Sequence, residues 1–301
     1  MAKLIINPAA GAGQTAKKLP LILNLLRSIG VRFEHDLTEG PGHARELAKA
    51  AAKKGHELVV SVGGDGTINE VVNGLYEANA LPDATLGIIS TGTGHDYVRT
   101  VGIPWTYPEA CQLLKNPQKC TVDVGVVEFP NNSNIEKRLF VNFSGIGFDA
   151  EVVRATTQNV KKLRSTASYL TGLLRTLMTY KNKRVSISID GQTADSRVCT
   201  VMMCNGRYGG GGMLTAPGAD LTDGLLDVLV IGNLSKPDLL WSLPRIYKGT
   251  HLTHPKVKLI KAKTIELKAK EPMALQADGE LIGQVPAKFY VLPACLNVAA
   301  R

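Results

Sequence analysis

Short apolar runs and helical patterns alternate along the first 124 residues. Each apolar run is followed by a polar or glycine-containing turn, and then by apolar residues at helical spacing. Repeated strand, turn and helix are typical of βαβ units, which build a parallel sheet covered by helices. We therefore predict an α/β domain with a Rossmann-like parallel sheet. Its strands are expected at 3–8, 31–40, 57–64 and 84–91, and its helices at 15–30, 42–55 and 67–78.

The pattern changes to short runs, several of them alternating, after a boundary near residue 124. These runs are bounded by Gly, Asp and Asn, which is typical of an antiparallel β-sandwich. Helical inserts are expected near 150–181 and 236–248. We predict an α/β domain at 1–124 and a β-sandwich domain at 125–301, with the extreme C-terminus able to return to the first domain. The expected strand segments are 138–148, 183–191, 196–206, 224–232, 263–269, 273–280 and 288–299.

Charge separates the two halves more clearly than composition does. Residues 1–124 hold 12 Lys and Arg against 12 Asp and Glu, whereas residues 125–301 hold 23 against 14 and carry the whole net charge of +9. A basic half favours an anionic partner such as phosphate, nucleic acid or a lipid surface. Nucleic acid is disfavoured because no binding motif occurs and only 5% of the residues are aromatic. The start lacks a signal-peptide pattern and no run approaches a membrane span, so a cytoplasmic protein is expected.

Three glycine-containing turns follow predicted strands: "NPAAGAG" at 7–13, "GGDGT" at 63–67 and "TGTG" at 91–94. The carboxyl ends of parallel strands share one edge of a sheet, so these turns should gather there. Gly63, Gly64 and Gly66 would let a ligand approach the main chain, and Thr67 can cap a helix whose free N–H groups attract phosphate. No Walker lysine motif occurs. The alternative is an ordinary strand-to-helix turn.

Carboxylates stand beside these phosphate-type turns. Asp65 would repel phosphate unless a divalent cation lay between them. Asp96, in "GTGHD", adds a second carboxylate, for which a helix N-cap is the alternative. Asp220, Asp223 and Asp227 could gather oxygens around Mg²⁺ or Ca²⁺, with an Asx-type turn as the alternative. Asp-Gly before Glu280 favours a hairpin turn.

A basic segment runs from Val152 to Ile189 without a single acidic residue. Its apolar residues recur at roughly helical spacing. A basic amphipathic helix can lie on an anionic membrane; a solvated helix packed on the sandwich is the alternative. Its cationic residues are Arg154, Lys161, Lys162, Arg164, Arg175, Lys181, Lys183 and Arg184.

Seven motifs occur in a fixed order across nearly the whole chain. They are "NPAAGAG", "TEGPGHARELA", "GGDGTINEVVNGL", "GTGHDY", "GIGFDAEV", "CNGRYGGGGMLTAPGADLTDGLLDV" and "ADGE". Together they resemble the bacterial soluble lipid kinases of the diacylglycerol kinase catalytic-domain family, relatives of sphingosine and ceramide kinases. "GGDGT" alone is less specific, because NAD kinases and phosphofructokinases have similar loops.

The resemblance implies a Rossmann-like, nucleotide-binding α/β domain for ATP at 1–124 and a β-sandwich domain for the lipid substrate at 125–301, with the active site in the cleft between them. It implies Mg²⁺ held by Asp65 and Asp96 at the phosphates, and Glu280 as the general base. Asp220, Asp223 and the carbonyl of Leu225 resemble a second metal position. The residues implied to contact ATP or lie close to it are Asn7, Gly11, Thr38, Gly64, Asp65, Gly66, Thr67, Ile68, Asn69, Glu70 and Thr93.

The expected function is an ATP- and Mg²⁺-dependent lipid kinase that converts diacylglycerol to phosphatidic acid. Its partners would be the lipid and, transiently, the anionic inner face of the cell membrane. Alternatives are a kinase for a sphingoid base, phosphatidylglycerol or NAD, and a nucleotide-binding module without catalysis. A homodimer is one candidate oligomeric state. The acceptor lipid and the choice between Mg²⁺ and Ca²⁺ stay open.

The chain departs from the family pattern at two positions. His95 stands where the family usually has Asn, and Tyr97 where Phe is common. Imidazole can still donate a hydrogen bond, but its charge can change near neutral pH. The hypothesis is that His95 alters pH dependence or substrate choice. An unchanged pH–rate profile in His95→Asn would contradict it.

Overall fold

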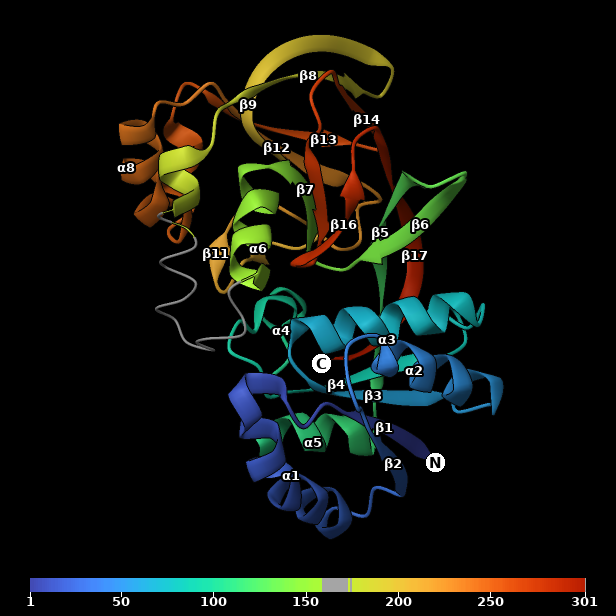
Figure 1. Ribbon diagram of the computed structural model, residues 1–301. Coiled ribbons are helices and arrows are strands. Elements are labelled where there is room, and N and C mark those ends of the chain that lie inside the picture. Colours follow the sequence, from blue (N-terminus) through green and yellow to red (C-terminus); the bar gives the residue numbers. More distant parts are fainter. Residues whose placement is uncertain (159–172, 174, 301) are drawn as a thin grey trace. The chain divides into compact units, whose positions relative to one another are not determined.

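The computed structural model describes residues 1–158, 173 and 175–300 (Figure 1). The chain divides into two compact units. The first comprises Met1–Val124, Leu221–Asp223 and Pro293–Arg301, and the second comprises Gly125–Asp220 and Gly224–Leu292. Two long strands, β5 (Gln118–Asn131) and β17 (Ala287–Ala300), belong to both units along the chain.

The first unit is built on a parallel sheet with strand order β4-β3-β1-β2. The end of β17 adds a further parallel strand beside β4 through Asn297 and Val298. Figure 1 shows α2 and α3 on one face of this sheet and α1 and α5 on the other. The predicted α/β fold is confirmed. The elements are β1 (Ala2–Ile6), α1 (Ala10–Ser28), β2 (Phe33–Leu37), α2 (His43–Lys53), β3 (Leu58–Gly63), α3 (Asp65–Glu77), β4 (Thr85–Ser90), α4 (Asp96–Val101) and α5 (Tyr107–Lys115).

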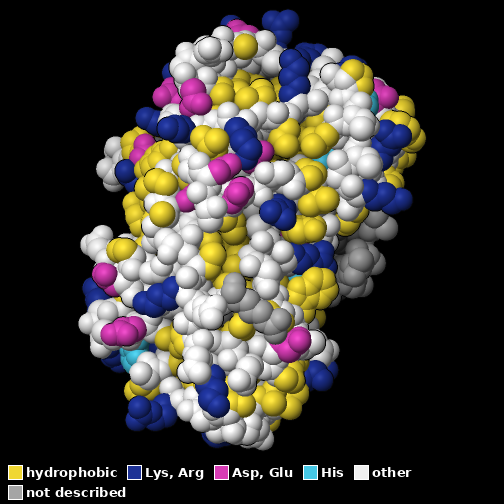
Figure 2. Space-filling view, turned by 180° about the vertical axis from the view of Figure 1, so that it is seen from behind, with side chains coloured by type: hydrophobic (Ala, Val, Ile, Leu, Met, Phe, Trp, Pro, Cys, Tyr) yellow, Lys and Arg dark blue, Asp and Glu magenta, His cyan; other side chains and the backbone are white. Residues whose placement is uncertain are grey.

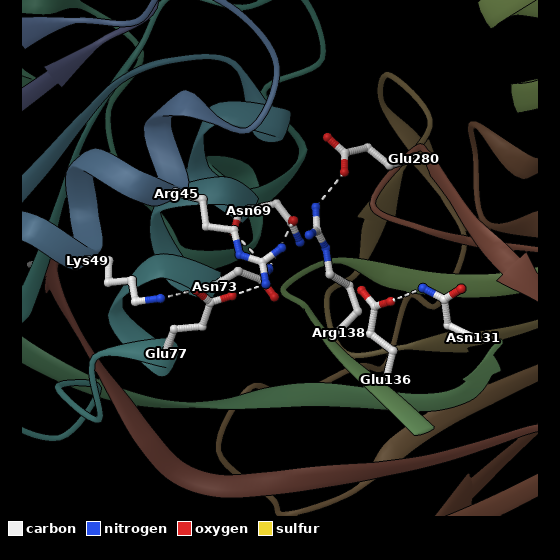
Figure 3. A network of polar contacts seen from close by, with 9 residues as sticks. All are labelled: Arg45, Lys49, Asn69, Asn73, Glu77, Asn131, Glu136, Arg138 and Glu280. Carbon is white, nitrogen blue, oxygen red and sulfur yellow. Dashed lines mark hydrogen bonds and ion pairs between the residues drawn. The ribbon is translucent and has the colours of Figure 1, made fainter. Parts of the chain in front are cut away.

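Apolar periodicity explains how the helices of this unit pack. Ile22 and Leu26, one turn apart on α1, are fully buried with Leu114 of α5 against the sheet strands. On the other face α2 and α3 approach closely at Gly74, where a Cβ would lie 2.2 Å from the carbonyl oxygen of Arg45. Glu77 forms ion pairs with Arg45 and Lys49 and so ties α3 to α2 (Figure 3).

The second unit is antiparallel, as the alternating pattern predicts. Its strands pair in antiparallel fashion, with β9 pairing β7, β8 and β12. Two apolar cores fill it, and the second packs beneath α6, α8 and residues 175–180. Its elements are β6 (Asn134–Phe140), β7 (Phe143–Gly147), α6 (Phe148–Gln158), β8 (Lys183–Ile189), β9 (Gln192–Cys204), β10 (Tyr208–Gly209), β11 (Met213–Leu214), β12 (Leu226–Gly232), α8 (Lys236–Ile246), η1 (Thr250–Thr253), β13 (Val257–Ala262), β14 (Thr264–Ala269), β15 (Ala274–Ala277) and β16 (Glu280–Gln284).

The run 138–148, predicted as one strand, is two strands in the structure. β6 ends at Phe140 and β7 begins at Phe143. The break is held from far along the chain, because the Asp278 carboxylate accepts the N–H groups of Val141, Asn142 and Phe143 at 2.7, 2.9 and 3.0 Å. Nothing in the local pattern signals that partner.

Candidate active site

The predicted gathering of the turns at one edge of the first unit is confirmed. β1, β3 and β4 are parallel neighbours, so their carboxyl ends lie side by side. Asn7, after β1, donates from Nδ2 to Oγ1 of Thr67 at 3.0 Å, which joins the first turn to the start of α3. The Thr15 and Thr91 hydroxyl groups are 2.5 Å apart and join the first turn region to the turn after β4. Three segments far apart in sequence thus form one surface.

Several glycines in these turns are required by packing between the turns themselves. A Cβ on Gly92 would lie 2.6 Å from Cα of Gly64, and a Cβ on Gly63 would lie 2.4 Å from Oγ1 of Thr67. Gly11 has φ +59°, and its Cβ would meet the carbonyl oxygen of Thr91 at 2.4 Å. These glycines therefore let the turns touch, and they say little about a ligand by themselves.

Gly66 differs from the other glycines of the edge. It is exposed, its φ is not positive, and a Cβ there would meet nothing within 4 Å. Neither backbone conformation nor packing therefore demands glycine at this position. Open space beside the main chain is what a phosphate needs to reach the N–H groups in the first turn of α3.

A second feature of the edge is a turn of unusual backbone conformation. Gly11, Ala12 and Gly13 have φ values of 59°, 53° and 84°, so three successive residues adopt the left-handed conformation at the start of α1. Ala12 holds this conformation without being glycine, which costs about 1 kcal/mol or more. Such positions store strain most often at functional sites.

Asp65 and Asp96 lie at adjoining helix starts. Asp65 is the first residue of α3, and its Oδ1 accepts the N–H of Tyr97 at 3.0 Å. This bond places its carboxylate at the N-terminus of α4, whose first residue is the buried Asp96. Carboxylate oxygens are the ligands that Mg²⁺ prefers, so Asp65 and Asp96 stay candidates for holding a magnesium ion. Across the described residues, no three His, Cys, Asp or Glu side chains cluster as a ready-made metal site.

Glu70 has a structural role that sequence reasoning missed. Its two carboxylate oxygens accept the N–H groups of Gly42 and Ala44, both at 3.0 Å, and so cap the start of α2. A carboxylate at a helix N-terminus also interacts favourably with the helix dipole. Ile68 and Asn69 are buried, so a ligand would reach their main chain rather than their side chains. Thr38 is held at the same edge, since its N–H donates to Ile6 O at 2.8 Å.

His95 occupies a position that explains the family preference for Asn. Its φ is 55°, in the left-handed region where Asn and His are among the more tolerant residues. The ring stacks on Trp105 at 5.4 Å between centroids, and Nδ1 lies 2.8 Å from the Ser90 hydroxyl. Burial lowers the His95 pKa, Asp65 opposes the shift, and Arg99 adds to it. The imidazole is therefore mostly neutral at pH 7, and its effect on activity stays a prediction.

In the second unit, Glu280 follows the predicted hairpin turn. Asp278 and Gly279 have φ values of 45° and 85°, as a two-residue turn between β15 and β16 requires. Oε2 of Glu280 accepts from Nη2 of Arg138 at 2.6 Å, and Figure 3 shows the two side chains pointing toward each other. The Glu280 side chain is 39% exposed, so a reacting group can reach it.

A buried polar network lies directly behind this turn. Oε1 of Gln276, a fully buried residue, accepts the N–H of Gly279 at 2.9 Å, and its Nε2 donates to Oδ2 of Asp149 at 3.0 Å. The other oxygen of Asp149 accepts from the Thr200 hydroxyl at 2.6 Å. Burial raises the Asp149 pKa, and these hydrogen bonds oppose the shift. The network holds the backbone next to Glu280. Asp149 lies within "GIGFDAEV", the only local signal for it.

The aspartates of "GADLTDGLLDV" divide between two environments. Asp220 and Asp223 are exposed in the loop before β12, beside Leu225, and they stay candidates for a second metal position. Asp227 is buried in β12 and forms an ion pair with Lys261 at 3.1 Å. The third aspartate therefore contributes to the sandwich.

Of the basic segment Val152–Ile189, the structure describes only part. Lys161, Lys162 and Arg164 lie outside the described residues. Arg154 forms an ion pair with Glu151, the residue just before the segment. Among the described residues, no helix has both the length and the apolar character needed to cross a bilayer.

Comparison with known proteins identifies both parts of the chain. Residues 1–127 match the diacylglycerol kinase catalytic domain, and residues 143–300 match the YegS C-terminal NAD kinase beta sandwich-like domain. A diacylglycerol kinase of Mycobacterium tuberculosis is 30% identical over 299 residues, covering 98% of this chain and 93% of that protein. One of Staphylococcus carnosus is 28% identical, covering 99% and 94%.

A solved structure supports the same conclusion. A crystal structure described as a diacylglycerol kinase from Bacillus anthracis superposes with a TM-score of 0.73 at 25% identity, covering 100% of this chain and 96% of that one. Both family matches, the relatives and the fold agree over nearly the full length. The chain therefore belongs to the diacylglycerol kinase family of bacterial lipid kinases, and it is a lipid kinase.

Proposed function

We propose that this enzyme transfers the γ-phosphate of ATP to the free hydroxyl of diacylglycerol and so forms phosphatidic acid. The observation that carries the proposal is the edge of the first unit where Gly66 leaves the main chain open at the N-terminus of α3. That edge suits a polyphosphate, and the relatives that match over nearly the whole chain are named diacylglycerol kinases.

Phosphoryl transfer depends on positioning and charge neutralisation more than on covalent chemistry. In the proposed mechanism, main-chain N–H groups of the α3 start and of the glycine turns bind the phosphate oxygens. Asp65 and Asp96 would hold Mg²⁺, which supplies charge neutralisation at the phosphates when bound. The Thr67 hydroxyl accepts a hydrogen bond from Asn7, which holds the first glycine turn against the start of α3.

We further propose that Glu280 is the general base. It would accept the proton of the lipid hydroxyl while that oxygen attacks the γ-phosphorus and ADP leaves. Arg138 would orient the Glu280 carboxylate, and the Gln276 network would fix its backbone. Asp220, Asp223 and the carbonyl of Leu225 are proposed as the second cation site, where oxygen ligands suit either Mg²⁺ or Ca²⁺.

The acceptor is tested by incubating the enzyme with γ-labelled ATP, Mg²⁺ and a panel of hydroxyl compounds. The panel holds diacylglycerol, a sphingoid base, phosphatidylglycerol and NAD. We expect label in phosphatidic acid, and we expect this labelling to be lost when the metal is chelated. Label only in NAD phosphate or only in another lipid would contradict the proposed substrate. An absence of transfer to every acceptor, with nucleotide still bound, would favour a module without catalysis.

A further inference from the structure

The solvent-facing side of α8 is apolar, the reverse of an ordinary surface helix. Leu240, Trp241 and Tyr247 are 52%, 57% and 51% exposed, and Pro244 is exposed between them. Residues spaced by three, four and seven positions lie on one side of a helix. We call these four residues the α8 outer face.

The opposite side of α8 fixes the helix in this orientation. Leu239 packs against the second core of its unit, and Ser242 is buried. Ser235 and Asp238 form a complete capping box at the N-terminus, so the start of the helix is also fixed. The outer face is therefore displayed by a well-anchored helix.

Basic side chains lie on α8 itself and on the chain that follows it. Residues 233–263 contain seven Lys and Arg and a single acid, Asp238, whose carboxylate takes part in the capping box. The guanidinium carbon of Arg245 lies 3.3 Å from the ring centroid of Trp241, a cation–π contact. Lys236 and Lys248 stand exposed near the two ends of the helix.

Residues 175–181 also combine exposed apolar and basic side chains. Lys236 donates to the carbonyl of Met178, which places residues 175–179 beside the start of α8. Met178 is 65% exposed, and Arg175 and Lys181 flank it. Hydrophobic side chains (yellow) interspersed with Lys and Arg (dark blue) are also visible on the molecular face drawn in Figure 2.

We infer that the α8 outer face is a docking surface for an anionic lipid bilayer. Leu240 and Trp241 would enter the headgroup–acyl boundary, where amphipathic aromatic rings are favoured. Arg245, Lys236 and Lys248 would face anionic headgroups, each adding electrostatic attraction that falls with salt. The inference rests on the proposal that the acceptor is a bilayer lipid, because such a substrate must be met at a membrane.

Two other occupants fit these observations less well. A second copy of the chain in a twofold contact would bring two strongly basic surfaces together, and like charges oppose such an interface. Three large side chains are also few for the roughly 800 Å² per partner that a stable dimer buries. Nucleic acid would use the arginine and the aromatic rings, but the aliphatic Leu240 and Met178 suit acyl chains better than bases.

The chain's two tryptophans allow a direct test. Trp105→Phe leaves Trp241 as the only reporter, and Trp241→Phe leaves Trp105. On vesicles of phosphatidylcholine and phosphatidylglycerol, the emission of Trp241 should shift to the blue and be quenched by brominated acyl chains. The Trp105 reporter should show neither change. An emission spectrum of Trp241 that is unchanged by anionic vesicles would overturn the inference.

A second pair of variants separates docking from catalysis. Leu240→Ala/Tyr247→Ala should weaken flotation with anionic vesicles about tenfold. The control Leu21→Ala/Ile135→Ala, which removes side chains that are 47% and 63% exposed, should float normally. On diacylglycerol in detergent micelles both variants should keep wild-type turnover. Normal flotation of the α8 variant, a change in its oligomeric state, or binding of RNA in place of vesicles would overturn the inference. Vesicle binding without diacylglycerol phosphorylation would contradict only the proposed function.

Discussion

The glycine edge of the first unit and the Glu280 turn of the second position functional groups in different ways. At the glycine edge, main chain packs closely against main chain, as where Gly92 meets Gly64, and short hydroxyl and amide side chains such as Asn7 and Thr67 join the turns. At the Glu280 turn, buried side chains from distant strands hold the backbone, as Gln276 and Asp149 do. The first arrangement depends on the absence of Cβ atoms and the second on matched hydrogen-bond donors and acceptors.

The substitution with the largest expected effect disrupts the side-chain network behind the Glu280 turn. Gln276→Glu keeps the shape of residue 276 but places a second buried carboxylate against Asp149. An unpaired buried charge typically costs about 3–5 kcal/mol, so the free energy of unfolding should fall by that order. Denaturant unfolding in mildly alkaline buffer measures it.

The matched rescue is the double variant Gln276→Glu/Asp149→Asn. The amide introduced at position 149 can accept from Thr200 and donate to the carboxylate introduced at position 276, which can still accept the N–H of Gly279. Most of the lost stability should return. If the single variant costs less than about 1 kcal/mol, an ordinary value for one hydrogen bond, the network does not hold the turn as described.

At the glycine edge, two alanine substitutions are expected to have smaller effects on stability, and they should separate stability from activity. Gly63→Ala drives a Cβ into Thr67 and should cost about 1–3 kcal/mol of stability, as overpacking does. Gly66→Ala meets open space and should change stability by less than about 0.5 kcal/mol. Yet Gly66→Ala should lower kcat/KM for ATP about 10- to 100-fold, because its methyl group occupies the phosphate approach.

Thermal unfolding measures the stability of the two variants, and steady-state kinetics measures their activity. Full activity in Gly66→Ala would contradict the assignment of the open main chain to a phosphate. An equal loss of stability in both variants would show that Gly66 serves packing after all.

The glycine edge and the Glu280 turn also differ in how much of their structure the sequence predicts. The glycine edge is predictable because parallel strands place their following turns together, and each turn is visible as a short motif. The Glu280 turn is predictable only as an Asp-Gly hairpin. The contacts of Asp278 with residues 141–143 join positions more than a hundred residues apart, and no local pattern carries them.

Two elements near the boundary between the halves were also missed for physical reasons. The sequence pattern does not predict the long strand β5 or the short helix α5. β5 is exposed at both ends and buried only in its middle, so its apolar pattern is short. Glu70 was predicted as a ligand contact from its motif, whereas its use as a cap for α2 depends on the fold.

The smallest effect concerns a buried histidine of the second unit. His251 donates from Nε2 to Thr215 O at 3.1 Å, and within the described part of the chain its Nδ1 has no hydrogen-bond partner. Burial lowers its pKa from 6.5, and the bond to Thr215 partly opposes the shift. A lowered pKa means that the unfolded state binds the proton more readily, so this contribution is present above pH 6.5 and lost as pH falls through the folded value.

Hydrogen exchange of the amides near η1 should therefore accelerate as the pH falls below 6.5, after correction for intrinsic rates. His251→Gln retains a donor for Thr215 but cannot titrate in this range. Its local stability should be independent of pH over the same interval. A wild-type chain that shows the same independence would contradict the assignment.

The proposed mechanism assigns the base to the Glu280 turn and the phosphate site to the glycine edge. Its most direct test is the rate of phosphate transfer from ATP to diacylglycerol by Glu280→Gln, beside Glu136→Gln as a control. Glu136 is a neighbouring carboxylate whose contact with Asn131 is drawn in Figure 3. We expect kcat to fall about 10²–10⁴-fold for Glu280→Gln and to stay at the wild-type rate for the control. Wild-type turnover by Glu280→Gln would contradict the assignment of Glu280 as the base.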